Sequence, residues 1–209
     1  METALAPCLP VTGPPNEPVI GKASTPQGVP SPFPSPELPQ VLLAVGGFAL
    51  LGLAGGLGSG VVEMTIRSVP AGVLIPVGTA VLTLPALLVV HQLSQFRAAP
   101  EVLIGAVSGA FVQTGRLALA LVPVVVFFAA TSGLWSLVFV GSGLLLGAVA
   151  ASSAARRLHA TEPPRSWLGA PRFTLLVLGW QLLALLVAAR LGVAAIAFVL
   201  APLRTGGVL

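Results

Sequence analysis

Reactive side chains are scarce in this chain of 209 residues. Cysteine occurs once, at Cys8, which excludes a disulfide within the chain and a structural zinc held by several cysteines. Six acidic residues and two histidines are spread along the chain. No nucleophile with a base, carboxylate pair or set of metal ligands can be recognised among them. We therefore expect a protein that is not an enzyme, with no catalytic residues, no metal and no cofactor.

Charge is scarce as well. Charged residues make up 8% of the chain, whereas a soluble domain carries about 25%. Hydrophobic residues make up 56%, and the mean hydropathy is +1.00. The net charge of +4 comes from ten basic residues that stand mostly alone, so there is no basic stripe for nucleic acid. Nine of the ten are arginine and tyrosine is absent, which indicates a GC-rich genome and a bacterial source.

Long uncharged runs are what the chain does contain. The longest extends from Leu117 to Ala155 and holds 39 residues. A membrane helix needs about 20 apolar residues, so this run is long enough for two crossings. Thr131-Ser132-Gly133 is the only place where it can turn, and the second helix of the pair then covers Leu134 to Ala155. Because lipid offers no hydrogen bonds to an open backbone, we expect an all-α bundle with about five transmembrane crossings.

The first 39 residues differ from the rest, because they contain eleven of the twenty prolines. We expect residues 1–39 to form a disordered, proline-rich cytoplasmic tail and residues 40–209 to form the transmembrane helical domain. Alternating prolines favour a polyproline II helix. Such a tail acts either as a stiff spacer, which we favour, or as a segment that docks into a groove of a partner protein.

Glycines recur at four-residue spacing in the apolar runs. The first expected crossing, Leu38 to Val62, carries three of them on one helix face. Small residues at this spacing let another helix approach closely in the membrane. The partner is either another helix of this chain or a second protomer. The candidate packing residues are Gly52, Gly56, Gly60, Gly105, Gly109, Gly143 and Gly147.

Four charged residues lie within or beside the expected crossings. Glu63 and Arg67 are four residues apart with the acid first, the favourable order for an ion pair on a helix. This pair either extends to the membrane interface, which we favour, or forms an ion site within the membrane. Arg116 and Arg190 each interrupt an apolar run and are candidate charges within the membrane. Arg116 must extend to the interface, which we favour, face the bundle interior or form a pair.

The remaining crossings have distinctive features. Ser68 to Val90 contains Pro76 and Pro85, which should bend the helix because proline removes a backbone hydrogen bond. Val102 to Ala130 is longer than a straight crossing requires, so it must tilt or extend into the interface. Phe173 to Leu203 is either one tilted crossing or a crossing followed by a returning half-helix. For it we favour a single crossing with an interfacial or re-entrant end.

The segment between the fourth and fifth crossings is rich in arginine. It contains Arg156, Arg157, Arg165 and Arg172. By the positive-inside rule this segment is cytoplasmic. Counting crossings back from it places the N-terminal tail in the cytoplasm too. We therefore expect a multi-pass protein of the bacterial inner membrane.

Short motifs of proline, aromatic and small residues occur in a characteristic order between Gly58 and Ala155. They are Val69-Pro70 to Ile75-Pro76, Thr83-Leu84-Pro85-Ala86, Val122-Pro123-Val124, Phe127-Phe128 and Thr131-Ser132. In this order the chain resembles bacterial membrane proteins of the YIP-domain type. The resemblance implies a helical domain of around five crossings that organises membranes or binds other proteins, with no catalytic residues.

Taken together, these features predict a small membrane protein that acts as a structural or interaction platform. Its expected partners are the lipid bilayer and a membrane or cytoplasmic protein that binds the N-terminal tail, and the features are also compatible with an oligomer. The alternative is a small transporter or channel subunit, in which helices bent by proline and charges within the membrane would form the substrate path.

Overall fold

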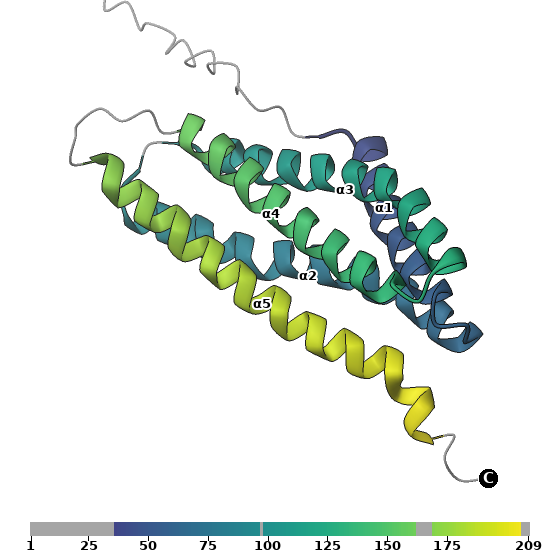
Figure 1. The fold of residues 1–209 in the computed structure, drawn as a ribbon. Helices are drawn as coiled ribbons and strands as arrows, with labels where there is room; N and C mark the ends of the chain where they lie inside the picture. The colour runs from purple at the N-terminus through teal and green to yellow at the C-terminus, as the bar shows by residue number, and fades with distance from the viewer. Residues whose placement is uncertain (1–35, 97, 162–168, 206–209) are drawn as a thin grey trace, which may run out of the picture. The chain divides into compact units, whose positions relative to one another are not determined.

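The computed structural model describes residues 36–96, 98–161 and 169–205, and this part of the chain contains α-helices and no strand (Figure 1). Each of its five helices is long and apolar enough to cross a membrane. The expected all-α fold with about five crossings is therefore confirmed. Most of the predicted disordered tail, residues 1–35, lies outside the described residues. The helices are α1 (Leu38–Leu57), α2 (Val62–Leu93), α3 (Pro100–Thr131), α4 (Trp135–Thr161) and α5 (Gly169–Thr205).

Helix α1 is shorter than the crossing that we expected up to Val62. Pro39 stands in its first turn, where the missing N–H costs no helical hydrogen bond. The helix ends at Leu57, and the chain then turns with Gly60 at a φ of 69°. Glycine adopts this left-handed conformation at little cost, so Gly60 stabilises the turn between α1 and α2.

Helix α2 is longer than the crossing that we expected from Ser68 to Val90. It begins at Val62 and therefore includes Glu63 and Arg67 in its first two turns. Pro76 and Pro85 lie inside the helix, which nevertheless continues without interruption to Leu93. Two threonines of α2 each donate a side-chain hydrogen bond to the carbonyl four residues earlier, at 2.6 and 2.8 Å.

The expected turn between the third and fourth crossings is confirmed. α3 ends at Thr131 and α4 begins at Trp135. The single crossing that we favoured for the last apolar run agrees with α5, which is one continuous helix to Thr205 and does not turn back within the described residues. A re-entrant end is therefore wrong. The residues on both sides of Arg190 are strong helix formers such as leucine and alanine, so nothing in the sequence breaks the helix there.

The helices pack in the order α5, α2, α1, α3 and α4. α1 packs against both α2 and α3, whereas α5 packs mainly against α2 and α4 mainly against α3. α4 and α5 contact each other only slightly. Two clusters of buried apolar residues hold the helices together. One joins α1, α3 and α4 around Phe48, Val125 and Leu146.

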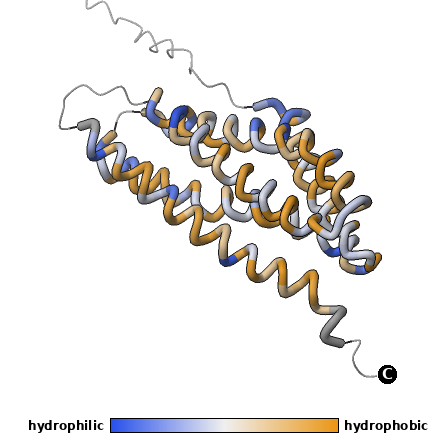
Figure 2. Tube along the Cα trace, in the orientation of Figure 1, coloured by the Kyte–Doolittle hydropathy of each residue, from blue (hydrophilic) through white to orange (hydrophobic). Residues whose placement is uncertain are grey.

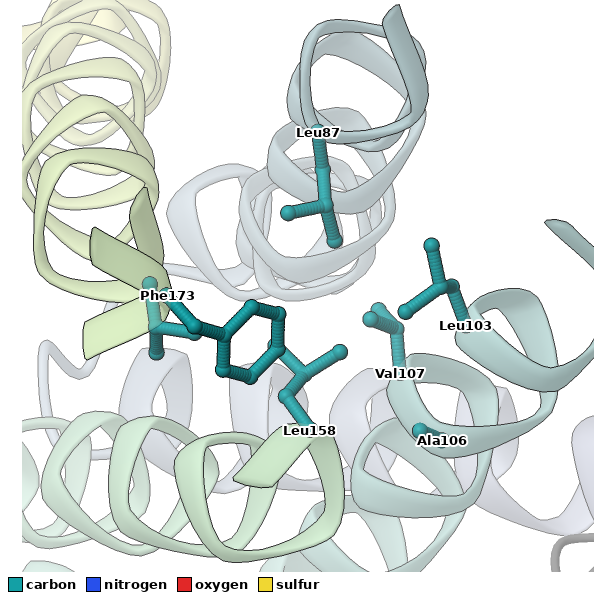
Figure 3. Packing of buried hydrophobic residues seen from close by; sticks show 7 residues of the cluster. Leu87, Leu103, Ala106, Val107, Leu158 and Phe173 are labelled. Atoms are coloured by element: carbon teal, nitrogen blue, oxygen red, sulfur yellow. The ribbon is translucent and has the colours of Figure 1, made fainter. Parts of the chain in front are cut away.

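The second cluster joins the end of α2, the start of α3, the end of α4 and the start of α5. Figure 3 shows Leu87, Leu103, Val107, Leu158 and Phe173 pointing toward one another from these four helices. Leu103 and Leu158 are almost fully buried. This cluster is the place where α5 meets both α2 and α4.

Much of the surface is apolar. Hydrophobic residues run along most of the length of α5 (Figure 2). In the apolar part of α1, 44% of the residues are buried, compared with 6% in α5. α1 is thus the central helix and α5 the most exposed one. An apolar surface of this extent is suited to contact with the hydrocarbon of a lipid bilayer.

Candidate functional site

Two of the candidate packing glycines lie at a close contact between α1 and α2. A Cβ atom on Gly52 would collide with the backbone of Ser68, and one on Gly56 would collide with the side chain of the same serine. Both glycines are buried. The two helices are therefore close enough that only glycine fits at these positions of α1.

The same type of contact joins α1 to α3. A Cβ atom on Gly47 would collide with the carbonyl group of Gly115, and one on Gly115 would collide with Ala44. Four-residue spacing did not select these two glycines, because neither has another glycine four residues away. Close approach here depends on a pairing between helices that one sequence does not reveal.

The other candidate glycines of the first three helices have different surroundings. Gly105 is buried in α3. A Cβ atom on Gly109 would lie 2.6 Å from the Nη1 atom of Arg157, so α4 presents a guanidinium group to α3 here. Gly60 differs from the expectation, because it lies in the turn after α1 and has nothing within 4 Å of its Cβ position.

Gly143 and Gly147 lie on an exposed face of α4. Nothing lies within 4 Å of the Cβ position of either glycine. One turn further along, Ala151 is also exposed. Because residues four apart lie on nearly the same side of a helix, these three residues form one strip, which we call the small-residue face of α4. In the described part of the chain, no other helix covers the two glycines of this face, and α5 reaches the face at Ala151.

Glu63 and Arg67 form the expected ion pair, with the Nη2 atom of Arg67 2.5 Å from the Oε1 atom of Glu63. Arg67 also donates a hydrogen bond of 3.3 Å to the carbonyl of Phe198, and its guanidinium carbon lies 5.3 Å from the centre of the Phe198 ring. The side chain of Glu63 is about half exposed. The pair therefore connects the first turns of α2 to the C-terminal part of α5.

Arg116 and Arg190 are both exposed on the outside of the bundle. Among the described residues, neither forms an ion pair or a hydrogen bond. Arg190 borders a cavity of about 280 Å³ between α2 and α5, which is also lined by Leu82, Leu186, Val187 and Leu191. The structure therefore places the two arginines on different helices, and it does not bring them together with Glu63 and Arg67.

An aromatic and histidine cluster lies at the opposite end of the bundle from Arg67. His91, the last basic residue of α2, is almost fully buried, and its ring centre lies 5.3 Å from that of Phe96 and 6.4 Å from that of Phe173. His159 of α4 contacts the same phenylalanine, with ring centres 5.6 Å apart. The sequence contains no signal that Phe173 joins the two histidines.

The hydrogen bonds of His159 define its tautomer. Its Nδ1 atom lies 2.8 Å from the carbonyl oxygen of Ala155, which can only accept, so Nδ1 carries the proton. In the neutral ring, Nε2 then accepts a hydrogen bond from the hydroxyl of Thr174 at 3.3 Å. His159 therefore connects α4 to α5 as a structural contact.

Two further hydrogen bonds attach the first half of α5. The indole N–H of Trp180 donates to the carbonyl of Thr83 on α2 at 3.1 Å. The side-chain amide of Gln181 donates to the carbonyl of Ala151 on α4 at 2.8 Å. Beyond this point α4 and α5 separate, as Figure 1 shows. The small-residue face of α4 continues from Ala151 away from this contact.

These features define the class of protein. The five helices form a multi-pass membrane protein whose surface contacts the lipid bilayer. In the part of the chain that the structure describes, no three histidine, cysteine, aspartate or glutamate residues are close enough to hold a metal ion. Comparison of the chain with protein families, with curated proteins and with solved structures found no match. The resemblance to the YIP-domain type stays a prediction.

Proposed function

We propose that this protein acts as an interaction platform in the membrane, and that a helix of another protein packs on the small-residue face of α4. The observation that carries the proposal is the contrast between two groups of glycines. The glycines of α1 that face α2 and α3 have neighbours at their Cβ positions, whereas Gly143 and Gly147 have none. Glycine inside a helix costs about 1 kcal/mol relative to alanine, so uncovered glycines weaken α4 unless a partner packs against them.

The predicted setting of this role is the inner membrane of a bacterium, with the N-terminus in the cytoplasm. There, the proline-rich tail of residues 1–39 would present a second binding segment to cytoplasmic proteins. The resemblance to the YIP-domain type implies a role of the same kind. We propose no catalytic activity.

The test compares bulky substitutions on two faces of α4. We expect Gly143→Ile with Gly147→Ile to abolish a stoichiometric complex that is purified from native membranes in mild detergent. Gly141→Ile is the matched control, because Gly141 is also exposed with nothing within 4 Å of its Cβ position. It points to a different side of the helix, since 3.6 residues make one turn. Equal loss of the complex in both variants would contradict a specific role of the small-residue face.

Two further variants identify the partner. In a Cys8→Ser background, we expect Gly143→Cys to form a disulfide between two copies only if the partner is a second copy of this chain. A variant without residues 1–39 should keep a partner that binds the helices and lose one that binds the tail. If no protein co-purifies with the unmodified chain or with any variant, the platform function is wrong.

Transport is the second candidate function. It is favoured by the three prolines inside α2 and by the charges of Arg116 and Arg190, which interrupt two crossings. Arg116→Leu distinguishes the two functions. A transporter with an essential charge should lose flux in reconstituted vesicles, whereas a platform should keep its complex and be at least as stable, because an arginine is removed from lipid.

A further inference from the structure

Arg190 lies within the depth of the hydrocarbon core. A Cβ atom on Gly78 of α2 would lie 2.9 Å from a side-chain carbon of Leu191, so this part of α5 is level with Gly78. Gly78 is eleven residues after Arg67 and thirteen before His91, which corresponds to about 16 Å and 20 Å along the helix. Half of the hydrocarbon core is about 15 Å. An arginine at such a depth needs a partner for its charge.

The described part of the chain offers no acid at this depth. Glu63 is paired with Arg67, at the start of α2. Glu37 precedes α1 and Glu101 is in the first turn of α3, so both are at the opposite end of the bundle. A second copy of the chain would place its own carboxylates at the same two ends. Within the described residues, therefore, neither this chain nor a second copy supplies a carboxylate to Arg190.

The cavity beside Arg190 indicates what kind of molecule could bind there. Its volume is about 280 Å³, and leucine and valine side chains form most of its wall. The cavity is a shallow groove that is open toward the lipid, and an extended alkyl chain can lie in it. The site thus combines one exposed cation with a shallow apolar groove on the lipid-facing side of α2 and α5.

We propose that this groove binds one acyl chain of an anionic phospholipid, and that the Arg190 guanidinium binds its phosphate. A guanidinium group can donate two parallel hydrogen bonds to a phosphate group. Arg190 is eight residues before Phe198, or about 12 Å along α5. A long arginine side chain can extend toward the interface, and local thinning of the bilayer brings the phosphate to meet it. The proposal does not rest on the platform function.

The test measures binding of defined lipids to the full-length protein by native mass spectrometry. The two probes are a phosphatidylglycerol and a phosphatidylcholine with identical acyl chains. We expect one phosphatidylglycerol per protomer to bind more tightly than phosphatidylcholine. Arg190→Gln should weaken its binding roughly tenfold to a hundredfold, because a hydrogen-bonded charge is lost. Arg190→Lys should have an intermediate effect, because it keeps the charge but not the paired donors.

Arg116→Gln is the matched control. Arg116 is also an exposed arginine within a crossing, but it is on α3 and does not line the groove. The binding constant of this variant for phosphatidylglycerol should stay within about twofold of that of the unmodified protein. Leu82→Phe should fill the groove and weaken binding of the acyl chain while leaving Arg190 in place. If Leu82→Phe does not fold, Val187→Phe tests the same wall.

Four results would overturn the proposal. Arg190→Gln could bind phosphatidylglycerol as tightly as the unmodified protein, or Arg116→Gln could weaken binding equally, which would indicate attraction by net charge alone. A protein that co-purifies only when Arg190 is intact, without bound phospholipid, would show that the counter-ion is an acidic side chain of a partner. Equal binding of oleate and phosphatidylglycerol would show that the phosphate is not recognised.

Discussion

Gly47 illustrates how tightly single residues are packed between α1 and α3. Its Cβ position is occupied by the backbone of Gly115, whereas the Cβ position of its neighbour Gly46 is open. We expect Gly47→Ala to lower the free energy of unfolding by about 1–3 kcal/mol, because two backbones must separate. Gly46→Ala should leave it unchanged or raise it by up to about 1 kcal/mol, since alanine is the better helix former. Thermal unfolding of both variants in detergent provides the measurement, and similar midpoints would contradict the close contact.

The sequence predicted that glycines lie at the helix contacts, but it predicted less well which glycines do so. Four-residue spacing selected Gly52 and Gly56, which do lie at a helix contact. It also selected Gly60, whose role in the turn follows from its backbone conformation and not from spacing. Gly47 was missed, because its importance depends on which residue of another helix is opposite.

At the scale of helices, α5 is attached unevenly. Its first half is held by Phe173, by Trp180 and by the bond from Gln181 to α4, whereas its exposed second half contacts mainly α2. Gln181→Leu removes a hydrogen bond between two membrane helices, which contributes about 0.6–1.7 kcal/mol. We expect this variant to unfold at lower temperature in detergent. Gln113→Leu is the control, because Gln113 is exposed on α3 without a hydrogen bond among the described residues. A destabilised control, or an unchanged Gln181→Leu, would contradict this role.

The number and order of helices could be predicted because hydrophobicity is a direct requirement of the bilayer. The ends of the helices could not be predicted, because apolar residues mark only the part of a helix that is in hydrocarbon. α2 begins six residues before the expected Ser68 and includes Glu63 and Arg67, because long charged side chains can extend away from hydrocarbon without ending a helix. α4 likewise continues past the expected Ala155 through Arg156 and Arg157. The cavity beside Arg190 depends on how α2 and α5 pair, which spacing within one helix does not encode.

At the scale of the whole bundle, the contacts fix which connections share a membrane side. The ring of Trp135, at the start of α4, occupies the Cβ position of Gly58, so the turns α1–α2 and α3–α4 are at one end. The contacts of Phe173 with His91 and His159 place the α2–α3 connection and the junction of α4 with α5 at the other. Locating a single connection in the cell therefore locates all of them.

The single native cysteine makes that measurement direct. If arginines of the α4–α5 segment are cytoplasmic, the tail that carries Cys8 is cytoplasmic as well, and Gly133 in the α3–α4 turn is on the outer side. We expect a membrane-impermeant maleimide to label Gly133→Cys, in a Cys8→Ser background, in intact cells. Cys8 of the unmodified protein should react only after permeabilisation. The reverse pattern would invert the orientation and leave the fold intact. Labelling of both cysteines from one side would contradict the fold itself, because three crossings separate them.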